Sequence, residues 1–108
     1  MKKINLDLQF KTLDDKTIVI SENKINKPLT LKFVLLNILG TYQAADGVES
    51  ITVYDVGIKI NRAKESIDLE DVEYELIKKV VNTNKLFVSI VTAQILKEFK
   101  KLEENKEG

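Results

Sequence analysis

The sequence of 108 residues contains no cysteine and no histidine. Without cysteine it has no disulfide bonds, thiolate zinc sites or cysteine nucleophiles, and without histidine it has no imidazole bases or imidazole metal ligands. Neither a phosphate-binding loop nor a dinucleotide fingerprint is present. No serine lies in a Gly-x-Ser-x-Gly context: Ser21, Ser50, Ser66 and Ser89. We therefore expect a protein that is no enzyme, with no catalytic residue and no cofactor.

An excess of charge of one sign is also absent, because seventeen basic side chains balance seventeen acidic ones. Such a chain has no general attraction to nucleic acid or to anionic lipid. Two groups of lysines have spacings that allow a local basic patch: Lys2, Lys3, Lys11 and Lys16, and Lys97, Lys100 and Lys101. Neighbouring acidic residues favour an ordinary charged surface, so nucleic-acid binding stays a minor alternative.

The densest acidic cluster comprises Asp68, Glu70, Asp71, Glu73 and Glu75. Hard cations bind carboxylate oxygens, which makes a divalent metal site the functional interpretation. On a helix, however, residues two positions apart point in different directions. Helix capping and solubility account for these side chains, and we expect no metal site.

Long apolar runs are missing too. The longest, "FVLL" followed after Asn37 by "ILG", is too short to span a bilayer. The N-terminus, "MKKINLDLQF", alternates polar and apolar residues at once, unlike a signal peptide. These patterns predict a cytoplasmic protein without a membrane segment.

The period-two pattern of Ile4, Leu6, Leu8 and Phe10 predicts a half-buried strand. A second β-branched run covers residues 18–20, and "LDDK" between the two suits a turn. Residues 1–21 are therefore expected to form an N-terminal β-hairpin. The following "SENKINKPLT" is interpreted as a polar connection.

Three helices follow from the 3.6-residue period. The first covers 31–40, capped by Thr30 and ended by Gly40, and is apolar nearly all round. The second begins after an Asp68 cap, has the stripe Leu69, Val72, Leu76 and Val80, and ends at "NTN". The third covers 86–104, with a buried stripe of Val88, Val91, Ile95, Phe99 and Leu102. All four phenylalanines fall in core positions, whereas Tyr42, Tyr54 and Tyr74 are the aromatic residues better suited to exposure.

The segment "ITVYDVGIKI" at residues 51–60 has an ambiguous period. Its residue types favour a strand, but the apolar alternation slips at Tyr54. As a helix it carries two apolar stripes: Ile51, Tyr54 and Ile58 on one side, and Val53, Val56 and Ile60 on the other. That pattern is typical of a helix packed between two partners.

The order of "LDDK", "LTLKFVLLNIL", "YDVGIKINRAKESIDL" and "DVEYELIKKVV" with "LFVSIVTAQILKEF" resembles a loose group of small, mostly uncharacterised bacteriophage and prophage proteins. The resemblance covers almost the whole chain. It implies a strand-turn-strand opening followed by helices, including a helix over residues 51–60. It also implies an accessory role in the cytoplasm of a bacterial host cell.

Together these patterns predict one α+β domain over residues 1–108, with a helical majority. We expect the β-hairpin (1–21) to pack on about four helices within residues 30–104, and residues 105–108 to fray.

The expected function is protein–protein contact, either in a homo-oligomer or with a phage or host protein, because the apolar side chains exceed what a chain of this length easily covers. A well-filled monomeric core is the equally simple alternative. Two other functions stay open: a tail-assembly chaperone or minor virion component, and a nucleic-acid-binding or host-regulator-binding protein. No small-molecule substrate is evident.

Overall fold

The computed structural model describes residues 1–104, so the predicted fraying of 105–108 lies outside the described residues. Residues 1–104 form four strands and four helices. The strands are β1 (Lys2–Asn5), β2 (Val19–Glu22), β3 (Ile25–Pro28) and β4 (Ser66–Leu69). The helices are α1 (Leu31–Thr41), α2 (Gly47–Arg62), α3 (Asp71–Thr83) and α4 (Ser89–Glu104). The α+β class and the helical majority are confirmed.

The first strand does not pair with the second, which corrects the predicted hairpin over 1–21. Instead β1 pairs antiparallel with β4, with Ile4 opposite Ile67. Both strands alternate, so Ile4, Ile67 and Leu69 are buried while Lys3 and its partner Asp68 are exposed. The period-two pattern of residues 4–10 therefore gave the buried positions correctly. The strand that pairs with β1 lies more than sixty residues further along the chain.

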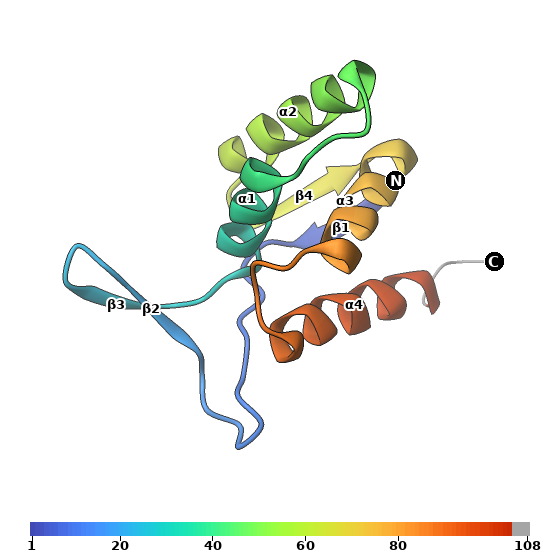
Figure 1. The fold of residues 1–108 in the computed structure, drawn as a ribbon. Coiled ribbons are helices and arrows are strands. Elements are labelled where there is room, and N and C mark those ends of the chain that lie inside the picture. The colour runs from blue at the N-terminus through green and yellow to red at the C-terminus, as the bar shows by residue number, and fades with distance from the viewer. Residues whose placement is uncertain (105–108) are drawn as a thin grey trace.

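The hairpin is formed by β2, which overlaps the predicted β-branched run at 18–20, and by β3, which lies within the segment predicted as a polar connection. Asn23 and Lys24 link the strands with φ values of 52° and 66°, a left-handed turn that suits a two-residue hairpin loop. Figure 1 shows this hairpin, here called the arm, projecting from the helices. The "LDDK" turn is also formed: the Thr12 N–H donates to the Lys16 carbonyl at 2.8 Å.

Helix α1 begins where predicted, because the Thr30 hydroxyl accepts a hydrogen bond from the Phe33 N–H at 3.4 Å. Gly40 does not end it, since the helix continues to Thr41 and no glycine adopts positive φ within residues 1–104. The buried residues of α1 lie on one face, at the spacing i, i+3, i+4, i+7 and i+8: Leu31, Val34, Leu35, Ile38 and Leu39. The apolar residues on its other side, Phe33 and Leu36, are only half-buried.

Residues 51–60 are helical, as the resemblance implied. Helix α2 is longer than that segment and begins after Asp46, whose carboxylate accepts from the Glu49 N–H at 2.8 Å. The helix is not packed between two partners, however. Val56 and Ile60 are fully buried, whereas Ile51 and Tyr54 are 64% and 68% exposed.

Helix α3 begins two residues later than predicted. Ser66–Leu69 is strand, so Asp68 caps no helix, and Glu70 and Glu73 form a reciprocal capping box instead. The predicted stripe was also partly wrong, because Val72 is 71% exposed. A larger apolar set faces the core instead: Tyr74, Leu76, Ile77, Val80 and Val81.

Helix α4 begins at Ser89, and Val88 is exposed, which corrects the predicted start at 86. The break at "NTN" is confirmed: the Asn84 side-chain oxygen accepts from the Leu86 and Phe87 N–H groups and shapes the turn between the helices. Val91, Ile95 and Phe99 are buried as expected.

The core gathers one apolar face from each helix and from the β1–β4 ribbon, and within residues 1–104 it contains no buried polar or charged side chain. Phe10 and Phe99 are buried and Phe33 and Phe87 pack partly against the core. Helix α3 lies between α4 and the α1–α2 pair (Figure 1). Across residues 1–104, no helix combines the length and the apolar character that crossing a membrane requires.

The one-sided burial of α2 makes a testable prediction. Ile60→Ala should lower the free energy of unfolding by about 2–5 kcal/mol, because it leaves a cavity in the core. Ile51→Ala, the same change on the exposed side, should alter it by no more than about 0.5 kcal/mol at a protein concentration that keeps the chain monomeric. Urea denaturation of both variants checks this; equal losses would contradict the assignment of the inner stripe.

Candidate interaction surface

One apolar stripe of α2 faces away from the core. We call Ile51, Tyr54 and Ile58 the α2 outer stripe; the first two are mostly exposed and Ile58 is half-buried. Their spacing of three and four residues places them on one side of the helix. Scattered exposed apolar residues are ordinary, but a contiguous stripe on a helix is typical of a contact surface.

A groove between α1 and α2 continues this surface. Its volume is about 520 Å³, and it includes Tyr54 and Ile58 of the outer stripe. No lining residue carries a charge: Leu36, Leu39, Gly40, Tyr42, Gln43, Ala44, Ser50, Val53, Tyr54, Gly57 and Ile58. In a chain in which 31% of residues are charged, that lining is distinctive. Depletion of charge at the centre and enrichment in tyrosine are compositional features of protein interfaces.

Two glycines leave the α1–α2 groove open. A Cβ atom placed on Gly40 of α1 or on Gly57 of α2 would meet no atom within 4 Å. The groove at these positions is therefore free space rather than packed interior. Another backbone or a flat ring can approach closely there.

The carboxylate of Glu49 fixes the connection that closes one end of the groove. It accepts hydrogen bonds from the Ala45 N–H at 2.8 Å and from the Tyr42 hydroxyl at 2.9 Å, and it pairs with Lys79 of α3 at 3.0 Å. The Ala45 N–H, then the Lys79 and Tyr42 donors, lower the pKa of Glu49 to about 2. This carboxylate holds α2, the α1–α2 connection and α3 together.

A second ion pair fixes the other half of α2. Lys59 pairs with Glu73 of α3 at 2.8 Å, and Glu73 also accepts from the Glu70 N–H. Burial opposes ionisation of Glu73, but these two donors outweigh it and lower its pKa. Both halves of α2 are thus tied to α3, which helps to set the rotation of α2 and to keep the outer stripe outward.

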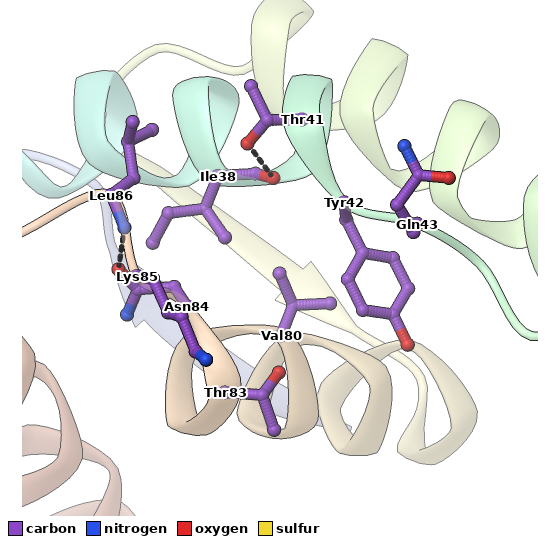
Figure 2. A pocket seen from close by; sticks show the side chains of 9 residues that line it. All are labelled: Ile38, Thr41, Tyr42, Gln43, Val80, Thr83, Asn84, Lys85 and Leu86. Atoms are coloured by element: carbon purple, nitrogen blue, oxygen red, sulfur yellow. Dashed lines mark hydrogen bonds between the residues drawn. The ribbon is translucent and has the colours of Figure 1, made fainter.

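A separate cavity of about 440 Å³ lies between the end of α1 and the α3–α4 turn (Figure 2). Its lining includes Tyr42, Thr41 and Asn84, whose polar atoms form hydrogen bonds within the chain. Asn84 alone donates to the Val81 carbonyl and the Thr92 hydroxyl and accepts from two N–H groups. Asn84 shapes the α3–α4 turn, Thr41 bonds within α1 and Tyr42 bonds Glu49, so these polar groups already have partners within the chain and we do not place the interaction surface here.

The acidic cluster is dispersed by the fold. Asp68 lies on β4 opposite Lys3, whereas Glu70 and Glu73 cap α3. Nowhere in the described chain do three acidic side chains come close enough to share a metal ion. In the N-terminal lysine group, Lys16 pairs with Asp14 and Lys11 donates to the Thr17 hydroxyl.

Of the three tyrosines expected at the surface, Tyr54 is exposed, Tyr42 is half-buried and Tyr74 is buried. The Tyr74 ring packs edge-on against Phe99 at 5.4 Å, and its hydroxyl donates to Glu103 at 2.6 Å. Burial, then the Glu103 carboxylate, raises the pKa of Tyr74. The prediction for Tyr74 was wrong because its hydroxyl reaches a partner at the rim while the ring fills the core.

No family model, curated protein or solved structure matches this chain. The bacteriophage resemblance therefore stays a hypothesis based on the quoted segments.

The Glu49 contacts predict a dependence of stability on pH. The pKa of Glu49 is about 2 in the folded chain against 4.5 as its ordinary value, so its stabilisation is complete above about pH 4.5 and is lost as the pH falls towards 2. Glu49→Gln should lower the melting temperature at pH 7, and its difference from wild type should shrink between pH 5 and 2. Asp55→Asn, which removes an exposed carboxylate from the same helix, should retain the wild-type profile in thermal unfolding. A constant difference for Glu49→Gln would contradict this account.

Proposed function

We propose that this protein is a non-enzymatic accessory protein of a bacteriophage or prophage. It acts in the cytoplasm of the bacterial host through protein–protein contact and associates with itself. The contact surface is the α2 outer stripe together with the α1–α2 groove. The observation that carries the proposal is the continuity of an exposed apolar stripe with a groove lined by uncharged residues.

The chemistry of this surface favours a protein over a small molecule. Tyr54 offers a large ring with a polar tip, and tyrosine is one of the residue types enriched among the residues that dominate binding energy at interfaces. Its neighbours Ile51 and Ile58 add aliphatic area, and full burial of a side chain of that size contributes about 1.5–3 kcal/mol. After the cost of association, we expect a dissociation constant on the order of micromolar.

Removing the apolar character of the stripe tests the proposal. The double variant Ile51→Ser with Tyr54→Ser should be monomeric where the wild-type chain is a dimer or larger, measured by light scattering from low to high micromolar concentration. Val72→Ser is the matched control, because it removes a similarly exposed aliphatic side chain from α3. A wild-type chain that stays monomeric throughout, or equal effects of the two changes, would count against the proposal.

The phage origin rests on the sequence resemblance alone, and it has its own test. Genes beside this one in its source genome should encode other phage proteins. A tape-measure or portal gene next to it would favour the tail-assembly alternative. Neighbouring genes that encode metabolic enzymes of a bacterial chromosome would contradict the phage origin.

A further inference from the structure

The charges of α2 are distributed unevenly along its length. Asp46, the N-cap, and Glu49 lie at its start, Asp55 is exposed near its middle, and Lys59 and Arg62 lie in its last turn. Glu49 and Lys59 are already paired with α3. Asp46 and Arg62 are exposed at opposite ends of the helix, beyond either end of the outer stripe.

The charges at the two ends of α2 are complementary to those of a second α2 that runs in the opposite direction. Asp55 lies near the centre of the pair in either orientation, so it does not distinguish the two. In a parallel pair of α2 helices, Arg62 would face Arg62 and the two helix dipoles would align. In an antiparallel pair, Arg62 of each copy lies at the end that carries Asp46 in the other, and the dipoles oppose. The apolar residues match as well: Ile51 lies three residues before Tyr54 and Ile58 three residues after Asp55, so both are equally far from the point between Tyr54 and Asp55.

We propose that the occupant of the interaction surface is a second copy of this chain, whose α2 packs antiparallel on α2 around a two-fold axis near Tyr54. Such a contact uses the same patch on both copies, as two-fold dimers do. This inference rests on the proposed function and names the partner and its orientation.

The same axis places Tyr54 of each copy beside the α1–α2 groove of the other. The groove holds about 520 Å³ of open space, and Gly40 and Gly57 leave room for an aromatic ring. Its lining includes Gln43 and Ser50, which can bond the tyrosine hydroxyl. Each copy therefore inserts Tyr54 into the groove of its partner.

The absence of cysteine makes the orientation measurable with single introduced thiols. In the antiparallel dimer, a mixture of Ile51→Cys and Ile58→Cys chains should form a disulfide between unlike chains under mild oxidation. Either variant alone should not, because its two thiols lie about 10 Å apart along the axis, beyond the Cα separation of about 7 Å that a disulfide spans. Cross-linking of Ile51→Cys with itself would show a parallel pair and overturn the inference.

Gly57→Ala tests the groove. Inside one copy the added methyl group meets no atom within 4 Å, and alanine favours a helix more than glycine does, so the melting temperature at a concentration that keeps the chain monomeric should rise by about 2–5 °C. Crowding of the inserted Tyr54 ring should weaken dimerisation about tenfold. Thr52→Ala, on the side of α2 away from the groove, is the control and should leave dimerisation unchanged. Unchanged dimerisation of Gly57→Ala would overturn the insertion of Tyr54.

The outcomes separate the two proposals. Suppose that the wild-type chain self-associates and the double variant Ile51→Ser with Tyr54→Ser does not, but that Ile51→Cys cross-links with itself. That result overturns the antiparallel dimer and leaves the proposed function in place. A wild-type chain that is monomeric at every concentration overturns both. Unlike-chain disulfides together with weaker association of Gly57→Ala support the dimer.

Discussion

A chain of this length builds one core, and α2 can turn only one of its two apolar stripes towards it. Apart from the Tyr74 hydroxyl, which bonds Glu103 at the rim, the core side chains within residues 1–104 are apolar, so burial of apolar area is what holds the elements together. Val56 and Ile60 take the inward side and Ile51 and Tyr54 are left outside. The exposed stripe is thus a consequence of how the core closes rather than a separate feature of the surface.

Electrostatics then helps to keep α2 from rolling to hide that stripe. Its first turn is tied to α3 through Glu49 and Lys79, and its last turns through Lys59 and Glu73. Surface ion pairs contribute little each to stability. The burial of Val56 and Ile60 fixes the rotation of α2, and the two ion pairs at opposite ends of the helix add to it. A hydrogen bond from Lys32 of α1 to the Ala63 carbonyl at 2.7 Å adds a third tie. The outer stripe stays outward because these contacts oppose rotation of α2.

The sequence predicted what local periods and caps encode, and missed what distant pairing decides. Thr30 and the apolar period defined α1, and the buried positions of β1 followed from its alternation. The partner of β1 did not, because β4 has four residues and its pairing depends on the whole chain folding back. The arm was missed because β3 carries no apolar alternation, although Asn23 is a residue type that tolerates the left-handed turn. For α3, Val72 and Ile77 offered competing stripes, and the set with more apolar area faced the core.

From the sequence, the candidate surface was predictable only as an excess of apolar side chains over what the core can cover. The two stripes on residues 51–60 predicted a helix packed on both sides, and only the general excess of apolar side chains indicated an uncovered surface. Which stripe is left exposed depends on the phase of α2 against α1 and α3. The α1–α2 groove could not be predicted from the sequence, because Gly40 and Gly57 belong to different helices. Glycine inside a helix costs about 0.5–1 kcal/mol relative to alanine. Within one copy, a Cβ on Gly57 meets nothing, so the packing of this fold gives no reason for glycine there. A second surface that approaches α2 closely would supply that reason.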